Sequence, residues 1–259
     1  SALQKNYWTL PWIKNNSIWK GHENIIERAM KDSDRWQKMA AAGISDEDIR
    51  KAFNTKTKMK VFTWNTKRET DTIMTPYDSV RYHKMIIQTG FMVMDPFTGE
   101  VKAWVGGIDF KTYKFDHVNL NTKRQVGSAI KPFLYCQAIE EAGFTPETPV
   151  EYVVQNFPGF GLVPAKGECK GNTVSMASAL TYSMNCATAY IMKQIGPKRF
   201  VEFLNNINIK SKMDPYPSIS LGAVDLSMFE MLYGYTMFAN HGFSTKPTYI
   251  TRIEDRNGN

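Results

Sequence analysis

Apolar residues recur at helical spacing in the first part of the chain. Residues 23–42 carry one apolar side, which predicts an amphipathic helix, and Gly43 is expected to end it. Ser45 is followed by three acidic residues in the manner of a capping box and predicts a second helix that ends near Phe53. The apolar side of the first helix consists of Ile26, Ala29, Met30 and Trp36.

Strand and helix patterns are mixed in the remainder of the chain. Residues 78–89 have a helical pattern, and residues 91–105 predict two strands joined by a turn that contains Pro and Gly. Helical patterns dominate from residue 128 to about 240, with a short helix at 175–182 and a loop at 157–172. A hairpin followed by helices predicts an α+β fold with the functional site between sheet and helices.

The composition is that of a folded domain with a basic surface. Over 259 residues, 42% hydrophobic and 22% charged residues are ordinary for a chain that buries a core. No stretch approaches the roughly 18 apolar residues that cross a bilayer. The net charge of +7 does not indicate nucleic-acid binding, because basic residues from Lys5 to Arg256 are interleaved with acids. One basic run could contact anionic lipid headgroups, and it consists of Lys56, Lys58, Lys60, Lys67 and Arg68.

The three cysteines leave at least one thiol without an intramolecular partner. No Cys-x-x-Cys pair or nearby histidine suggests a metal site, so we expect no metal. Cys136 lies on a helix with an apolar pattern and is expected in the core. Cys186 is expected to be buried as well. A disulfide between Cys169 and Cys186 is the less favoured alternative to free thiols.

A serine and a lysine one helical turn apart are the first candidates for chemistry. Ser128 and Lys131 stand at i and i+3, which separates them by roughly 4.5 Å along a helix and puts them on one face. Gly127 lets the backbone turn sharply into that helix. The pattern matches a nucleophile and its base, although most isolated Ser-x-x-Lys pairs are solvated helix surface.

A second motif favours the interpretation of Ser128 and Lys131 as a nucleophile and its base over that of a solvated helix surface. Ser183-Met184-Asn185 follows the short helix predicted at 175–182. Ser-x-Asn puts two polar side chains on the same side of an extended turn, so both Ser183 and Asn185 can face the cleft that holds Ser128 and Lys131.

These motifs together resemble the transpeptidase region of class A, bifunctional penicillin-binding proteins. The resemblance covers roughly residues 56–259, and residues 1–55 resemble the helical linker that follows a glycosyltransferase domain in that family, a domain this sequence does not contain. Besides the two motifs, it rests on Met59-Lys60-Val61-Phe62 to Met74-Thr75-Pro76-Tyr77-Asp78-Ser79-Val80, on residues 91–107, on Ser218-Ile219-Ser220-Leu221-Gly222-Ala223, and on Tyr235-Thr236-Met237-Phe238-Ala239-Asn240-His241-Gly242.

The resemblance implies a fold and a reaction. The fold would be the penicillin-binding and serine β-lactamase-like one, with a helical subdomain and an antiparallel sheet that is incomplete here. Ser128 would attack a D-alanyl-D-alanine stem peptide, and a neutral Lys131 would be its base. Ser183 would pass a proton to the leaving amine, Asn185 would orient Lys131 and the substrate, and Gly127 would contribute to substrate binding. No cofactor is implied.

The resemblance also implies partners and a location. They are peptidoglycan stem peptides, the lipid-linked precursor and β-lactam antibiotics, at the periplasmic face of the bacterial inner membrane. We expect an N-terminal membrane anchor that this sequence does not contain.

One departure from the family concerns its third motif. Neither Lys-Thr-Gly nor Lys-Ser-Gly occurs in the sequence, and Lys246-Pro247-Thr248 does not substitute for it. We therefore expect a truncated chain whose sheet lacks three C-terminal strands. We also expect acylation at least about a hundredfold slower than in a parent that carries the motif, because one oxyanion donor would be lost.

Two other classes of function stay open. A non-catalytic penicillin-binding or sensor module would explain the absent motif. A serine β-lactamase would share Ser-x-x-Lys and Ser-x-Asn, and Glu168 and Asn172 have a suggestive spacing. However, they precede Ser183, whereas the deacylating glutamate of class A β-lactamases follows Ser-x-Asn.

Overall fold

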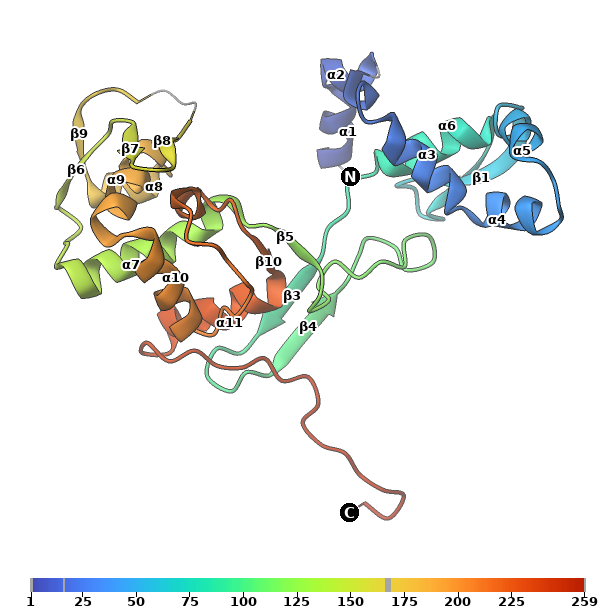
Figure 1. Cartoon of the computed structure of the whole chain (residues 1–259). Coiled ribbons are helices and arrows are strands. Elements are labelled where there is room, and N and C mark those ends of the chain that lie inside the picture. Colours follow the sequence, from blue (N-terminus) through green and yellow to red (C-terminus); the bar gives the residue numbers. More distant parts are fainter. Residues whose placement is uncertain (1, 16, 166–168, 259) are drawn as a thin grey trace. The chain divides into compact units, whose positions relative to one another are not determined.

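The computed structural model describes residues 2–15, 17–165 and 169–258, and the chain divides into two compact units (Figure 1). The first unit comprises Ser1–Thr89 and Gly107–Lys114, and the second comprises Gly90–Gly106 and Phe115–Asn259. The sequence pattern suggested a boundary after residue 55. The structure instead keeps residues 56–89 with the first unit, because the helix at residues 76–84 packs against two of the preceding helices and against the first strand of this stretch.

The first unit is a set of short helices and one hairpin around a small core. Its core side chains are Ile26, Met30, Trp36, Ile49 and Phe53. The strands β1 and β2 pair antiparallel, with Thr57 opposite Met74. In chain order the elements are α1 (Ala2–Thr9), α2 (Pro11–Lys14), the 3-10 helix η1 (Ser17–Trp19), α3 (Glu23–Lys31), α4 (Asp34–Ala41), α5 (Asp46–Phe53), β1 (Thr57–Phe62), β2 (Glu69–Met74) and α6 (Pro76–Lys84).

The single helix predicted over residues 23–42 is wrong in one respect, since it is two helices. The Ser33 hydroxyl accepts a hydrogen bond from the Trp36 backbone N–H at 3.3 Å and donates to the Met30 carbonyl at 2.6 Å. A serine that caps backbone N–H groups in this way starts a new helix, so α3 ends and α4 begins around Ser33. The helix predicted over 78–89 also ends early, at Lys84.

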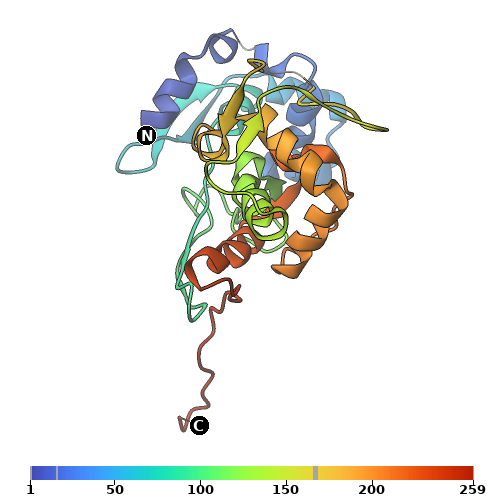
Figure 2. The ribbon, with the colours of Figure 1, turned by 90° about the vertical axis from the view of Figure 1, so that its left-hand side faces the viewer.

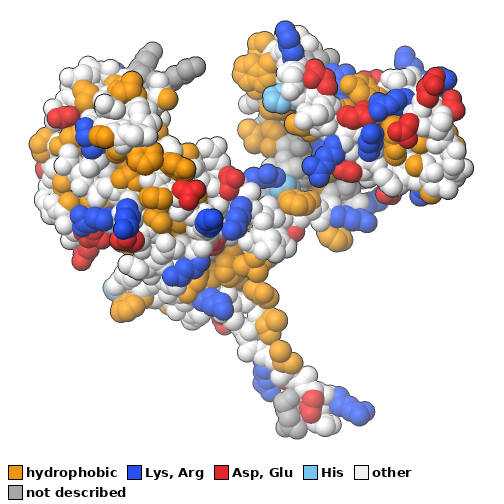
Figure 3. Space-filling model, in the orientation of Figure 1, with side chains coloured by type: hydrophobic (Ala, Val, Ile, Leu, Met, Phe, Trp, Pro, Cys, Tyr) orange, Lys and Arg blue, Asp and Glu red, His pale blue; other side chains and the backbone are white. Residues whose placement is uncertain are grey.

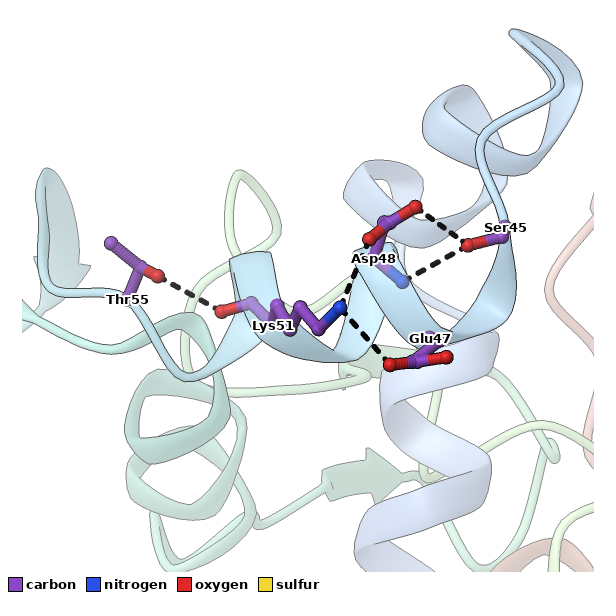
Figure 4. Close-up of polar contacts among 5 residues, drawn as sticks. All are labelled: Ser45, Glu47, Asp48, Lys51 and Thr55. Carbon is purple, nitrogen blue, oxygen red and sulfur yellow. Dashed lines mark hydrogen bonds and ion pairs between the residues drawn. The ribbon is translucent and has the colours of Figure 1, made fainter.

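The capping pattern at Ser45 is confirmed. The Asp48 backbone N–H donates to the Ser45 hydroxyl at 3.2 Å, and the hydroxyl donates to the Asp48 carboxylate at 2.8 Å (Figure 4). One turn further on, Lys51 forms ion pairs with Glu47 at 3.0 Å and Asp48 at 3.4 Å. These contacts lie at the surface and fix the start of α5 without any chemistry of their own.

The second unit contains a large helical core and several short strand pairs. In Figures 1 and 2, α7 runs beside α9 and α10, and the main hydrophobic core lies among these helices. The elements are β3 (Phe91–Met94), β4 (Val101–Val105), β5 (Lys123–Gln125), η2 (Gly127–Ile130), α7 (Lys131–Ala142), β6 (Pro149–Glu151), β7 (Gln155–Phe157), β8 (Gly161–Val163), β9 (Thr173–Ser175), α8 (Met176–Thr181), α9 (Asn185–Ile195), α10 (Pro197–Asn206), η3 (Pro217–Leu221), β10 (Asp225–Ser227) and α11 (Met228–Ala239). The predicted α+β class is confirmed.

The predicted hairpin at 91–105 is confirmed, and its sheet is small. Phe91 pairs opposite Val105 in the antiparallel β3–β4 ladder. Among the described residues, this hairpin pairs with no other named strand, and an isolated parallel bridge joins Glu100 to Thr248. Three apolar side chains of the two strands are exposed, namely Phe91, Val93 and Val105, and so is Phe97 in the turn. The first part of the predicted loop at 157–172 forms a hairpin instead, because β7 and β8 pair with Phe157 opposite Gly161.

The surface of each unit mixes basic and acidic side chains on the face that Figure 3 presents. This agrees with the interleaved charges of the sequence. Within the described ranges, none of the helices combines the length and the apolar character needed to cross a bilayer.

Candidate functional site

Lys131 lies at the centre of a polar cluster in the second unit. It is the first residue of α7, and only 1% of its surface is exposed. Its amine donates to the Ser183 backbone carbonyl at 2.7 Å, to the Ser183 hydroxyl at 3.0 Å and to the Asn185 side-chain oxygen at 2.7 Å. The structure thus brings together three of the residues singled out in the sequence, across two motifs far apart in the chain.

The turn between α8 and α9 places both Ser183 oxygens on Lys131. Ser183 has a φ of 51°, in the left-handed region that non-glycine residues rarely adopt. Its N–H donates to the Leu180 carbonyl at 3.0 Å, and the Met184 N–H donates to the Ala179 carbonyl at 2.9 Å. These two bonds form a Schellman motif, in which the left-handed position is usually glycine. A serine held in this strained conformation is typical of a functional position.

Asn185 follows as the first residue of α9, with Met184 as the extended residue before it. We expected Ser-x-Asn to form an extended turn. The structure replaces that turn by a left-handed residue, an extended residue and a helix start, and the two side chains still converge on Lys131.

Burial lowers the pKa of Lys131 from its ordinary value to about 8. The shift corresponds to about 3 kcal/mol against the charged form. All three hydrogen-bond partners of the amine are neutral oxygens, so no carboxylate among them offsets the cost of burial. A neutral amine keeps two N–H donors and gains a lone pair, which a hydroxyl such as that of Ser183 can approach as a donor.

Ser128 lies in η2, one turn before Lys131, and is exposed. Within the described residues its hydroxyl has no hydrogen-bond partner, so the approach to Lys131 expected from the sequence is not a hydrogen bond here. Gly127 directly before it has a φ of +55°, which fits the sharp turn expected of that glycine. The Ser128 hydroxyl is thus exposed, and the Lys131 amine is held by Ser183 and Asn185 of the second motif.

A cavity of about 360 Å³ borders the residues on either side of Ser128. Val126 and Ala129 form part of its wall, and most of the other lining residues come from β5, β10 and α11. The remaining wall includes Arg124, Leu226, Met231, Leu232 and Tyr235. Open space therefore lies beside part of the backbone around Ser128.

A disulfide joins Cys169 to Cys186, with a Cα–Cα distance of 6.0 Å. The preference for free thiols at these two positions was wrong. The segment before β9 folds back on Tyr152, whose N–H donates to the Asn172 carbonyl at 2.8 Å, and β6 in turn packs on α9. Cys136 is unpaired and partly buried, and burial raises the pKa of its thiol. Glu168, part of the β-lactamase alternative, lies outside the described residues.

One contact of the site was missed in the sequence. The Tyr135 hydroxyl and the Thr188 hydroxyl lie 3.0 Å apart and join α7 to α9 in the core. Tyr135 follows Lys131 by four residues and Thr188 follows Asn185 by three, so helical spacing from the motifs was the available signal.

Two family models match successive parts of this chain. Residues 9–87 match the penicillin-binding protein middle domain, and residues 89–259 match the penicillin binding protein transpeptidase domain. The boundary between the two matches falls where the two compact units divide.

Several known proteins are similar to this chain. Penicillin-binding protein 2D of Bacillus subtilis is 34% identical over 182 residues, which is 66% of this chain and 26% of that protein. Penicillin-binding protein 1A of Rickettsia felis is 32% identical over 180 residues, covering 66% and 22% of the two chains. The chain thus spans about a quarter of the length of these relatives.

Solved structures give the same result. Penicillin-binding protein 1A of Haemophilus influenzae matches with a TM-score of 0.58 at 26% identity, covering 66% of this chain and 26% of that one. PonA1 of Mycobacterium tuberculosis shares the fold with a TM-score of 0.56 at 19% identity over 91% of this chain and 62% of that one. The transpeptidase domain model covers well over half of the sequence. This chain therefore belongs to the penicillin-binding protein transpeptidase family.

Proposed function

We propose that the second unit holds the acyl-transfer site of a peptidoglycan D,D-transpeptidase, with Ser128 as the nucleophile and Lys131 as its base. The observation that carries the proposal is the burial of Lys131 among neutral oxygens, with a pKa lowered to about 8. A base works best when its pKa is close to the operating pH, and lysine reaches that range only when its charge is disfavoured.

In the proposed acylation, the Ser128 Oγ attacks the carbonyl carbon of the D-alanyl-D-alanine peptide bond while its proton passes to the Lys131 amine. The tetrahedral intermediate collapses with cleavage of the C–N bond. The departing amine takes a proton through the Ser183 hydroxyl, which lies 3.0 Å from the Lys131 amine. D-Alanine leaves, and an ester joins Ser128 to the stem peptide.

In the proposed second step, an amine from a neighbouring peptidoglycan strand attacks the ester carbonyl and forms a new amide bond. The C–O bond to Ser128 breaks, and a proton from the amine returns through Lys131 to the Ser128 oxygen. Asn185 holds the Lys131 amine through its side-chain oxygen, which leaves its amide nitrogen for the substrate backbone. The Ser128 N–H at the start of the helical turn stabilises the developing oxyanion, and Gly127 gives the substrate room to approach.

The surroundings of this reaction are proposals as well. The substrates are peptidoglycan stem peptides, with β-lactams as analogues that acylate the same serine. The location is the extracytoplasmic side of the bacterial cell envelope. A lipid-linked precursor, an upstream glycosyltransferase domain and an N-terminal membrane anchor complete the proposed context. Because the sequence has no Lys-Thr-Gly or Lys-Ser-Gly motif, we propose that acylation by this chain is slow.

Overnight exposure to fluorescent penicillin, followed by intact-protein mass spectrometry and peptide mapping, tests the proposal. One adduct on Ser128 is expected, with none in Ser128→Ala. Ser45→Ala, in the first unit, is the matched serine control and should label like the unaltered chain. An adduct that persists in Ser128→Ala, or no adduct on the unaltered chain, would overturn the proposal. Rapid penicillin hydrolysis without a stable adduct would favour a β-lactamase instead.

A further inference from the structure

The segment of residues 123–129, called here the nucleophile segment, is held by backbone from much later in the chain. The β5 strand pairs with β10, with Gln125 opposite Asp225. The hydrogen bonds continue beyond these strands, since the Val126 N–H donates to the Val224 carbonyl at 3.1 Å. The Gly127 N–H then donates to the Gly222 carbonyl at 3.2 Å. The last backbone N–H before Ser128 is therefore fixed by Gly222.

Gly222 approaches the nucleophile segment so closely that no side chain fits. It follows η3 with a φ of +77°, and a Cβ built on it would lie 1.9 Å from the Gly127 carbonyl oxygen and 2.4 Å from the Gly127 Cα. A gap this small cannot be opened by rotating a side chain, because both sides are backbone. Any residue with a Cβ at position 222 would have to displace Gly127 and, with it, Ser128.

Tyr235 holds the other side of Ser128. It lies on α11, and its hydroxyl donates to the Ala129 carbonyl at 2.7 Å. Its ring packs edge-on against Phe133, a fully buried residue of α7, with ring centroids 4.8 Å apart. Val126 and Ala129 border the cavity described above, and the segment is held there by its backbone hydrogen bonds to Val224 and Gly222 and by the Tyr235 hydroxyl.

We infer that Gly222 and Tyr235 are positioning residues for the Ser128 nucleophile, an inference that rests on the proposed acyl transfer. Neither residue supplies a reacting group. Gly222 fixes the backbone just before Ser128, and Tyr235 fixes the carbonyl just after it. The reaction needs this precision, because misplacing a nucleophile by about 1 Å can cost roughly a hundredfold in rate.

Gly222→Ala, compared with Gly143→Ala, separates displacement from simple backbone strain. Gly143 ends α7 with a φ of +67°, and a Cβ there would meet no atom within 4 Å. Both variants therefore place alanine in left-handed backbone, but only Gly222→Ala displaces the nucleophile segment. With labelled penicillin at saturating concentration, we expect the acylation rate constant of Gly222→Ala to fall about ten- to a hundredfold. Gly143→Ala should stay within about twofold of the unaltered chain.

Tyr235→Phe, compared with Tyr82→Phe, removes one hydroxyl without a steric change. Tyr82 in the first unit also donates to a backbone carbonyl, that of Phe62, at 2.7 Å. A lost hydrogen bond of this kind is worth about 1 kcal/mol. We expect Tyr235→Phe to slow acylation about fivefold and Tyr82→Phe to leave the rate unchanged. If Gly222→Ala does not fold, this pair decides the question.

The acylation rate constant and the final labelled fraction are measured together, because a positioning defect and a folding defect change different ones of these two quantities. A positioning defect lowers the rate constant while every molecule is eventually labelled. A purely structural defect lowers the labelled fraction and leaves the rate constant of the folded molecules unchanged, and that outcome would overturn the inference. Equal rate constants within each matched pair would overturn it too. If the unaltered chain is not labelled at all, the proposed function fails rather than the positioning role.

Discussion

In the first unit, lysines lie at the surface beside carboxylates. Lys51 forms ion pairs with Glu47 and Asp48, and 67% of its side chain is exposed (Figure 4). Lys60 and Lys111 share Glu69, again at the surface. In the second unit, Lys131 is buried and contacts three neutral oxygens of Ser183 and Asn185. The same residue type is thus placed in two opposite electrostatic settings.

The exposed lysines and Lys131 differ in whether water and an anion compensate the charge of the ammonium group. Exposed ion pairs keep an ammonium in water beside an anion, and each contributes about 0 to 1 kcal/mol to stability. Burial without an anion disfavours the ammonium, which lowers the pKa of Lys131 to about 8. The first setting keeps a lysine charged at the surface, and the second gives Lys131 the lowered pKa that the proposed base needs. The proposed chemistry therefore depends on the lack of a carboxylate among the hydrogen-bond partners of Lys131 as much as on the lysine itself.

The largest effect is expected from removing each lysine in turn. Lys131→Ala should slow acylation by labelled penicillin about a thousandfold, because a positioned general base contributes roughly 10² to 10⁴ in rate. Lys51→Ala should leave the rate unchanged and alter the free energy of unfolding by less than about 0.5 kcal/mol. Timed labelling and chemical denaturation of both variants give the two numbers. Similar acylation rates in the two would remove the distinction between base and surface lysine.

Lys51 has carboxylate partners, and giving Lys131 a carboxylate partner should make its electrostatic setting resemble that of Lys51. Asn185→Asp would put a carboxylate at the position that now accepts at 2.7 Å from the amine. A nearby anion should raise the pKa of Lys131 by about 1 to 3 units. Because the neutral amine is the form that the proposed mechanism uses, acylation at pH 7 should then fall about ten- to a thousandfold and recover as the pH rises. A rate profile over pH 6 to 9.5 that does not move to higher pH would contradict the electrostatic account.

The predictable part of the site came from motifs. Ser-x-x-Lys and Ser-x-Asn pointed to Lys131, Ser183 and Asn185, because such spacings fix residue types that the chemistry needs. The left-handed Ser183 and the close approach of Gly222 to Gly127 were not foreseeable, since both depend on backbone from distant segments. The Cys169–Cys186 pairing was misjudged for the same reason.

The fold was predictable where local signals were strong. The Ser45 cap and the hairpin at 91–105 were identified from turn and capping residues. Ser33 was read as an ordinary position within a helix, although its hydroxyl caps a new one. The pairing of β7 with β8 lies within the expected loop, and such short strands could not be predicted from the sequence pattern of that loop.

A smaller effect is expected at the strained turn. Ser183→Gly removes the hydroxyl beside Lys131 and places in the left-handed position the residue that tolerates it best. Ser183→Ala removes the same hydroxyl and keeps the strain. Both should slow acylation about tenfold, since each lacks the proposed proton path. Ser183→Gly should nevertheless be about 1 kcal/mol more stable than Ser183→Ala in urea unfolding. Equal stabilities would show that the turn stores no strain.

The smallest effect on the reaction is expected in the first unit. Ser45→Ala removes the cap of α5 and should lower the free energy of unfolding of that unit by about 1 kcal/mol. The acylation rate should not change, because the cap has no part in the site. Thermal unfolding and timed labelling measure the two. A slower reaction in this variant would mean that the units are coupled more closely than their separate cores indicate.

A direct titration of the Lys131 amine tests the central claim. Carbon-13 labelling of lysine ε-carbons allows its protonation to be followed by NMR, and the signal that disappears in Lys131→Arg identifies the residue. The account predicts a midpoint near pH 8, so that a measurable fraction of the amine is neutral at pH 7. A midpoint at the ordinary lysine value of about 10.4 would contradict it, because Lys131 would then be as fully charged as a lysine at the surface.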